Sequence, residues 1–563
     1  MRFLSTSSSR VILFLSILVS CKGKNSAPSK DLIAGMNLKT GAIISCGPAD
    51  KQFGSVDFEM SCSSAAKKDF NLAMELLHSF EYDESEKVFA KVINESPDCA
   101  MAYWGVAMSN FHPLWNPPTE AEFQKGTKAV ELAKSITNKT ARETAYIDAI
   151  TAFFKDWSII QHHTRCVDFE KGMEKVYKDY PDDKEAAIFY ALSLVASAEL
   201  TDKTYKNQRK AGDILNALYA KYPDHPGIVH YIIHTYDYPG LATEALTAAR
   251  RYASVAPSSA HALHMPSHIF TRLGLWDEDI KSNLESVASA KCYGESSGIK
   301  GHWDEELHGL DYLVYSYLQK GENDSAKSLL SYLQTIDLLN PVSSFKGGYA
   351  FAAIPSRVAL ENKNWTAAAS LQLHPVNFPW KNFPWQEAII RFARTMGLIN
   401  SGKMDAAKSE LAILNRLHDT LEKQKDAYKT KEVLIQIKTC EAWMNFKMGK
   451  TNDALQQMKL AADMEDSTGK HAVTPGEVIP ARELLGDMLT LAGQYENALQ
   501  GYETGLQKTP NRFNSVYGAA VAAEKAGDKE KATAYYNQLL TIVGSAKSDR
   551  AELLVAKSFL AKQ

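Results

Sequence analysis

Three histidines lie within the segment HALHMPSHIF, which spans residues 261–270. His261, His264 and His268 are separated by three and then four positions, so on an α-helix their side chains lie on one face. Imidazole binds zinc, copper, nickel and iron, and it exchanges protons near neutral pH. The segment therefore indicates metal binding or acid–base chemistry.

The same residue types recur in the two flanking helical segments. His230, His234 and Asp237 lie in HYIIHTYDYP, and His308 and Asp311 lie in HGLDYLVYS. If the three segments are neighbouring helices, their imidazoles and carboxylates share one surface. We expect His308 or Asp311 to complete a ligand shell, or to orient a ligand through its second nitrogen.

Two histidine pairs are the predicted metal ligands. His230 with His234, and His264 with His268, have the i,i+4 spacing of helix-borne zinc sites. Residues seven apart on one helix lie ~10 Å apart along its axis, so one ion would not easily bind both His230 and Asp237. We expect a pair from one helix to be completed from the next. The expected cofactor is a transition metal (Zn, Cu, Ni or Fe), because calcium requires more oxygen ligands.

The elements that carry these residues belong to a helical repeat. Gly493 and Gly527 are 34 residues apart, as are Ala498 and Ala532, which is the tetratricopeptide period of two antiparallel helices. Glycines at 274, 321, 402, 449, 493 and 527 are expected to end first helices, and alanines at 245, 326, 407, 454, 498 and 532 to allow close packing of second helices. The predicted fold is all-α: a tetratricopeptide-repeat right-handed superhelix, or α-solenoid, with an irregular N-terminal arm.

The repeat register predicts where the histidines point. In tetratricopeptide proteins the turn glycine is position 15, and positions 2, 5, 9 and 12 of the first helix face a concave groove. Aligning Gly240, Gly274 and Gly321 at position 15 places one ligand-binding patch in that groove. Its members are His230, His234, Asp237, His261, His264, His268, His308 and Asp311.

The first residues indicate export. Arg2 and Arg10 form a positive n-region before the short apolar run from Val11 to Val19, which suits a signal peptide, and Leu18-Val19-Ser20-Cys21 resembles a bacterial lipobox. A plain secretory signal is the alternative. The predicted organisation is a lipoprotein signal peptide (1–20), a lipidated tether and extended arm (21–64), a repeat array (65–545) and a C-terminal capping helix (546–563). The predicted location is the bacterial cell envelope, lipid-anchored to the outer membrane and facing the periplasm.

Export also permits disulfides. Cys46 and Cys62 are predicted to pair, because both lie in the irregular arm. The other four cysteines after Cys21 lie in or beside helical stretches and are expected to be small core residues: Cys99, Cys166, Cys292 and Cys440.

Longer segments carry a resemblance to a known group. LLHSFEYDESEKVF, PDCAMAYWGVAMSNFHPLW, HPGIVHYIIHTYDYP, LDYLVYSYLQKG and TPGEVIPARELLGD, together with the segment around His261, resemble a family of exported bacterial tetratricopeptide-repeat proteins over residues 53–530. The family has no established biochemical role. The resemblance therefore implies the fold and export, and it supplies no catalytic residues.

Composition and motifs narrow the function classes. The net charge is −3 with no long basic run, which disfavours nucleic acid as a partner. HExxH, GxSxG and phosphate-loop motifs are absent. The expected function is a membrane-anchored scaffold whose groove binds a ligand. The alternatives are a scaffold for an unknown protein or peptide partner in envelope assembly, a metal-dependent or acid–base enzyme, and a sugar-binding lipoprotein.

The lipobox makes a direct prediction. Labelled fatty acid supplied to the native organism should be incorporated into the protein, and Cys21→Ala should abolish the label because it removes the acceptor thiol. A mature protein that carries no lipid and begins at another residue would contradict the prediction.

Overall fold

The structure is a computed structural model, and it describes residues 27–48, 52–114, 117–199 and 202–562. Within these ranges it is built of helices, and the only strands are β1 (His302–Trp303) and β2 (Leu339–Asn340), which pair in parallel. The prediction of an all-α helical-repeat fold is confirmed. The signal peptide and Cys21 lie outside the described residues.

The N-terminal half runs as far as Leu273. Its helices are α1 (Lys30–Ala34), η1 (Ser64–Ala66), α2 (Lys67–His78), α3 (Tyr82–Glu95), α4 (Ala100–Ser109), α5 (Glu120–Ser135), α6 (Ala141–Phe154), α7 (His162–Asp179), α8 (Lys184–Ala196), α9 (Lys206–Tyr219), α10 (Pro226–Tyr236), η2 (Ala242–Ala245), α11 (Leu246–Val255), α12 (Ala260–His264) and α13 (Pro266–Leu273).

The C-terminal half continues with the same pairing of helices. Its helices are α14 (Trp276–Ser297), α15 (Asp304–Gln319), α16 (Asn323–Leu333), α17 (Phe345–Glu361), α18 (Trp365–Ser370), η3 (Trp380–Asn382), α19 (Pro384–Asn400), α20 (Met404–Lys423), α21 (Ala427–Lys447), α22 (Thr451–Asp466), α23 (Ala481–Leu491), α24 (Tyr495–Lys508), α25 (Phe513–Ala526), α26 (Lys529–Val543) and α27 (Ala551–Leu560).

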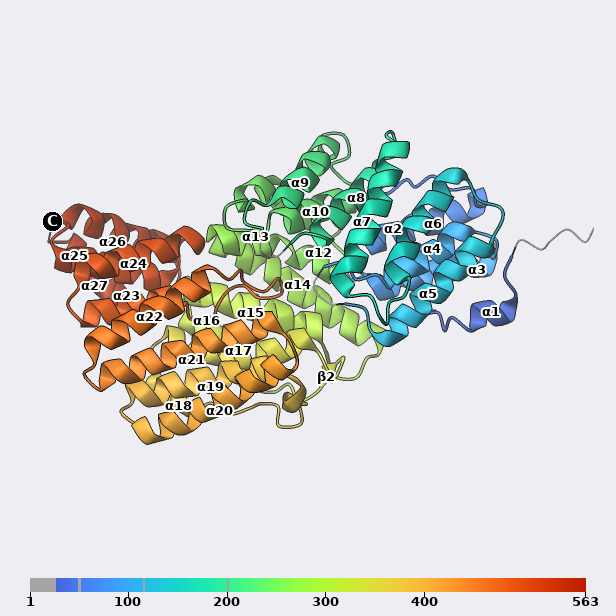
Figure 1. The fold of residues 1–563 in the computed structure, drawn as a ribbon. Coiled ribbons are helices and arrows are strands. Elements are labelled where there is room, and N and C mark those ends of the chain that lie inside the picture. Colours follow the sequence, from blue (N-terminus) through green and yellow to red (C-terminus); the bar gives the residue numbers. More distant parts are fainter. Residues whose placement is uncertain (1–26, 49–51, 115–116, 200–201, 563) are drawn as a thin grey trace, which may run out of the picture.

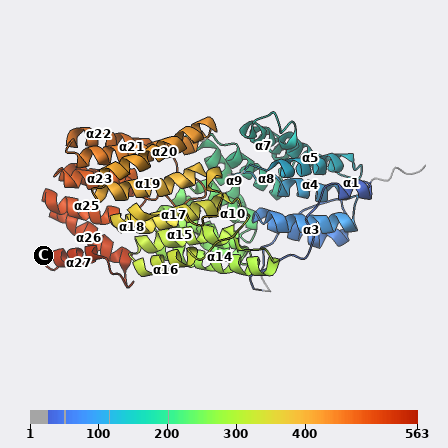
Figure 2. The same ribbon diagram turned by 90° about the horizontal axis from the view of Figure 1, so that it is seen from below.

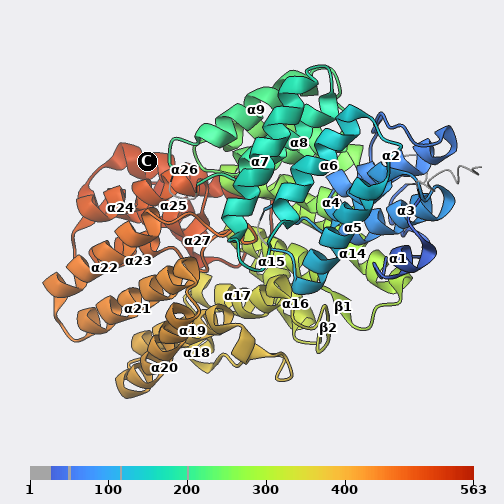
Figure 3. The ribbon, with the colours of Figure 1, turned by 45° about the vertical axis from the view of Figure 1, so that its right-hand side comes forward.

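The helices stack into an elongated body with the two halves at opposite ends (Figures 1 and 2). Each half has its own apolar core: one contains buried side chains between Met36 and Phe270, and the other contains those between Trp276 and Ala556. Helices α14 and α15 lie between the halves (Figure 3). The histidine-bearing helices α10, α12, α13 and α15 therefore meet at the seam of the two cores.

Local sequence explains the helix pairs. All six predicted turn glycines have positive φ, for example 65° at Gly274 and 83° at Gly527, which residues with a Cβ rarely adopt. All six predicted packing alanines are fully buried where helices cross. The tetratricopeptide spacing therefore identifies the turns and the close contacts correctly.

Pro266 divides the histidine-bearing segment. It has no N–H to donate to the preceding turn, so the helix is divided into α12 and α13. Met265 between them keeps helical angles, with φ −53° and ψ −34°. His261, His264 and His268 consequently stay on one side of a nearly continuous rod. Pro355, by contrast, lies inside the single helix α17.

The arm packs along the N-terminal half and includes a short helix, α1, that its sequence does not predict. The backbone N–H groups of its residues donate to side chains and carbonyls of separate helices or loops. Ile44 donates to Glu84 (3.1 Å), Ser55 to the carbonyl of Asp224 (3.2 Å) and Ser61 to Glu143 (2.7 Å). The arm is therefore held along its length.

The predicted Cys46–Cys62 disulfide is wrong. Cys46 pairs with Cys292 on α14, and Cys62 pairs with Cys99 at the start of α4. Cys46 and Cys62 lie in parts of the arm that pass over different helices. Each forms a disulfide with the cysteine of the helix that its part of the arm covers. Cys99 and Cys292 are therefore not free core residues, whereas Cys166 and Cys440 are buried thiols as expected.

Across the described ranges, no helix has both the length and the apolar character needed to cross a bilayer.

The disulfides give a test of the arm. Non-reducing peptide mapping should recover the pairs Cys46–Cys292 and Cys62–Cys99, with Cys166 as a thiol. Cys292→Ala should lower the free energy of unfolding by ~2–5 kcal/mol, because it frees a long loop in the unfolded chain. Cys166→Ala is the matched control with no bridge to lose. Recovery of Cys46 joined to Cys62 would contradict the structure.

Candidate metal centre

The histidines predicted to line an open groove are buried. Five of the six histidines are buried, from His230, which is fully buried, to His261, which has 7 % of its surface accessible. The sixth, His234, is partly buried. Phe80, just after α2, lies beside the rings of His230, His234 and His261. The ring centroids of Phe80 and His230 are 4.4 Å apart. Residues 467–480, the crossing segment between α22 and α23, reach the site through Lys470. The predicted groove residues therefore lie in a buried part of the structure.

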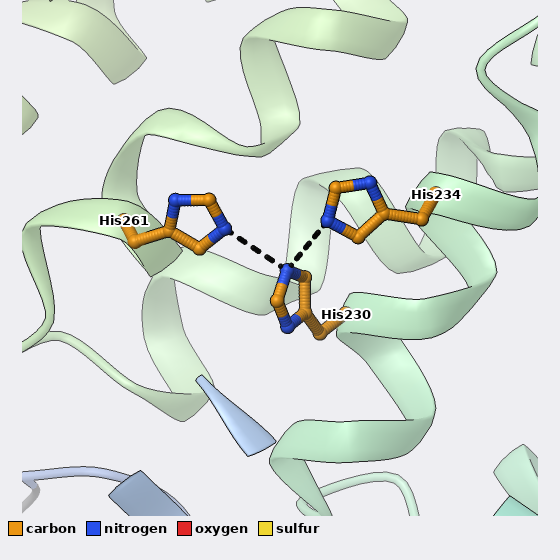
Figure 4. Close-up of side chains that lie close together, drawn as sticks. All are labelled: His230, His234 and His261. Atoms are coloured by element: carbon orange, nitrogen blue, oxygen red, sulfur yellow. Dashed lines mark hydrogen bonds between the residues drawn. The ribbon is translucent and has the colours of Figure 1, made fainter. Parts of the chain in front are cut away.

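The first cluster consists of His230, His234 and His261 (Figure 4). The i,i+4 pair on α10 is in contact, with 2.9 Å between the Nε2 atoms of His230 and His234. His261 on α12 completes it, its Nε2 lying 3.1 Å from that of His230. The pair on α10 thus lies beside an imidazole from another helix at ligand-compatible spacing.

The second cluster consists of His264, His268 and His308. The Nε2 atoms of the α12–α13 pair, His264 and His268, lie 3.1 Å apart. His308 on α15 lies beside His264, with 4.2 Å between ring centroids and the ring planes tilted by 49°. Because α15 belongs to the second core, this cluster joins the two halves of the molecule.

Hydrogen bonds on the far side of two rings in the second cluster fix the tautomers of His264 and His268. His268 Nδ1 donates to Asp237 Oδ2 at 3.0 Å, and His264 Nδ1 donates to Asn283 Oδ1 at 2.7 Å. A neutral imidazole has one N–H, so both Nε2 atoms carry lone pairs. The two Nε2 lone pairs therefore face each other at 3.1 Å, and the Tyr312 hydroxyl lies 3.4 Å from His268 Nε2. A cation between the rings removes this repulsion.

His230 in the first cluster is oriented in the same way. Its Nδ1 donates to the backbone carbonyl of His78 at 2.6 Å, which leaves Nε2 as a bare acceptor toward His234 and His261. Such second contacts orient ligand imidazoles in metal sites. Three of the six rings are therefore held with Nε2 directed at a neighbouring Nε2.

The spacing of the nitrogens suits an ion. Two ligand nitrogens at 2.0–2.1 Å from zinc and at the tetrahedral angle lie ~3.3 Å apart. The Nε2 contacts of 2.9, 3.1 and 3.1 Å are slightly shorter. Rotations that separate the rings by a few tenths of an ångström would admit a metal.

Asp237 supports the second cluster rather than supplying a ligand of its own. Its carboxylate accepts from His268, from Arg272 Nε (2.8 Å) and from Lys470 Nζ (3.3 Å). Burial raises its pKa, but Lys470 and Arg272 outweigh that effect and hold the pKa well below its ordinary value. Burial lowers the pKa of Lys470 to about 8.

Asp311 lies outside the histidine clusters, and its predicted role as a ligand is wrong. Its carboxylate forms a buried ion pair with Arg357 on α17. Arg357 also donates to the Gly476 carbonyl of the crossing segment at 2.7 Å. The carboxylate of Asp311 therefore pairs with the guanidinium group of Arg357 on the neighbouring helix α17, and it does not face the histidines.

A third buried cluster, His78, Glu185 and His225, escaped the sequence analysis. Glu185 accepts from His78 Nε2 at 3.0 Å and from His225 Nε2 at 2.8 Å. Between these rings donors and acceptor match, and the atom of this cluster without a hydrogen-bond partner is His225 Nδ1, which does not face Glu185. An exposed group at His418, Asp419 and Glu422 on α20 also has ligand spacing.

The sequence analysis also missed the supporting residues Asn283 and Lys470. Asn283 lies on a second helix, α14, whose residues the groove register does not consider. Lys470 lies where the interval from Gly449 to Gly493 exceeds the 34-residue period. In the sequence, that extra length indicates a segment that does not belong to the regular helix pairs.

Burial governs the charge of all six imidazoles. It lowers the pKa of His230 to about 3, because the charged form loses its water. For the other five, burial is again the largest cause and lowers the pKa below the ordinary value. The rings are therefore neutral at pH 7, the form that binds metal.

Comparisons with known proteins add little beyond the fold. No protein-family model and no curated protein matches the chain. Among solved structures, the human IFIT1 dimer with m7Gppp-AAAA is 12 % identical, covering 85 % of this chain and 95 % of that one, with a TM-score of 0.34. Yeast Tom70 is 9 % identical, covering 89 % and 96 %, with a TM-score of 0.32. Such scores support no argument about function, and membership of the exported bacterial family stays a prediction.

The lowered histidine pKa values predict acid sensitivity in chelator-treated protein. Above pH ~7.5 the six histidine rings are neutral in both the folded and the unfolded protein. Below ~6.5 the unfolded chain binds protons that the folded protein excludes, so stability falls by ~1.4 kcal/mol per pH unit for each such histidine. Unfolding temperatures measured by circular dichroism should therefore decline from pH ~6.5 downward.

Two variants separate protonation from packing. His230→Gln removes one titrating ring and should make the decline shallower. Phe80→Leu removes a neighbouring ring that binds no proton, so it should lower the unfolding temperature without changing the slope. A decline that begins only below pH ~5, where ordinary carboxyls titrate, would contradict the prediction.

Proposed function

We propose that this protein is an exported helical-repeat scaffold that binds transition-metal ions through its two trihistidine clusters. The observation that carries the proposal is the pair of lone-pair-bearing Nε2 atoms of His264 and His268, 3.1 Å apart. Asp237 and Asn283 direct them at each other from outside. A purely structural histidine pair would place a donor opposite an acceptor, as the third cluster does.

The proposal includes export and lipid anchoring at Cys21. The two disulfides support export, because such bonds persist in oxidising compartments. The lipobox-like sequence supports the anchor, and the outer membrane facing the periplasm remains the proposed location.

Use of the same concave face as a peptide-binding groove has less support. Arg357 and Tyr315, which would line such a groove, are buried, and Arg357 is bonded to the crossing segment. A peptide would have to displace that segment first.

Zinc titration of untagged protein, after removal of metal with a chelator, tests the proposal. Calorimetry near neutral pH should show sub-micromolar binding. His268→Ala should weaken binding at its cluster by more than ~100-fold, because loss of even a supporting residue costs 10–100-fold. Zinc should also raise the unfolding temperature.

A matched control variant is available on the surface. His163→Ala changes a histidine whose side chain is 46 % exposed, and it should leave zinc affinity unchanged. Circular dichroism should first show that each variant is folded. If zinc, copper, nickel and iron all bind more weakly than millimolar, the proposal is wrong.

A further inference from the structure

The two trihistidine clusters are neighbours, not separate sites. The ring centroids of His234 in the first cluster and His268 in the second are 6.4 Å apart. Within the second cluster, His268 and His308 are also 6.4 Å apart. The gap between the clusters therefore equals a spacing inside one of them, and the six rings form one continuous group.

Chain connectivity explains this proximity. His261 belongs to the first cluster and His264 to the second, yet they lie one turn apart on α12. Each cluster thus takes one imidazole from α12 and the others from helices packed on either side: α10 for the first, α13 and α15 for the second. Ions bound by the two clusters would therefore each be held by one side chain from the same helix, α12.

Within the described ranges, each cluster consists of three imidazoles and includes no carboxylate. The carboxylate of Asp237 accepts from His268 and is compensated by Arg272 and Lys470. Three protein ligands leave one position open on each ion, as in catalytic metal sites. Two adjacent three-coordinate ions would have their open positions available to one shared ligand.

The absence of anionic donors among these six ligands favours a low charge on each ion. Two divalent ions bring four positive charges into a desolvated site beside Lys470, which costs much free energy unless an anionic ligand such as a bridging hydroxide enters with them. Two cuprous ions bring half that charge, and three ligands suffice for each. Imidazole also suits copper, which heads the affinity series of divalent first-row metals when oxidised.

We infer that the two clusters form one dinuclear copper centre, with one ion per trihistidine cluster and a shared site for a small oxygen ligand. This inference rests on the proposed metal-binding function. With dioxygen as oxidant, each cuprous ion loses one electron and one dioxygen gains both, giving peroxide. Peroxide and two waters then give hydrogen peroxide and two hydroxides, one of which bridges the cupric ions.

Electron paramagnetic resonance tests the pairing. Every protein should carry His418→Ala, which removes the exposed ligand group on α20. Chelator-stripped, untagged protein is loaded with Cu(I) without oxygen, desalted and assayed for copper. The expected result is two coppers per chain. After exposure to air, X-ray absorption should show cupric ions whose resonance signal is nearly absent, because a bridge couples the two spins.

Half-site variants provide the matched comparison. His308→Ala disables the second cluster and His261→Ala the first, so each should retain one copper that gives its full signal in air. His163→Ala should behave as the parent protein. The signal of the parent is then weaker than that of variants holding half its copper, which loss of folding alone would not produce.

Several outcomes would overturn the inference. Two coppers with full signal intensity would mean two independent sites. One copper at saturation, or copper that stays cuprous in air, would also contradict it. Each of these leaves metal binding intact, whereas protein that retains neither copper nor zinc would contradict the proposed function itself.

Discussion

The arrangement of the centre depends on the desolvation of six imidazoles at the seam between two apolar cores. Burial holds them neutral, as the lowered pKa of His230 illustrates. Neutral rings can pack against one another and against Phe80, which charged rings would not tolerate. The same neutrality leaves lone pairs directed inward. Packing and metal affinity therefore have one physical origin.

Hydrogen-bond complementarity distinguishes the clusters from one another. Glu185 accepts two N–H groups from His78 and His225, so every polar atom between these rings has its match. In the second cluster, Asp237 and Asn283 take the N–H groups away from the shared space. Two acceptors that face each other repel, and a bound cation would remove that repulsion.

Segments outside the repeat enclose the centre. The crossing segment brings Lys470 to Asp237 and closes the concave face. The arm, anchored by Cys46–Cys292 and Cys62–Cys99, covers the N-terminal helices. His78, whose carbonyl orients His230, belongs to α2, far from α10 in the sequence. A solenoid with only neighbouring contacts would leave these rings in water, and their pKa values would not be lowered by burial.

The sequence alone determined the helical-repeat fold, its turns and the face on which the histidines lie, because these follow from short periods and from residues such as Gly274 and Pro266. It also identified the two i,i+4 histidine pairs, one of which belongs to each cluster. Only the tertiary structure decided that His261 joins the first pair, that His308 rather than Asp311 joins the second, and that the cysteines bond to other helices. These contacts join residues that are distant along the chain. Their choice depends on which surfaces meet when the array closes, and no local spacing encodes that information.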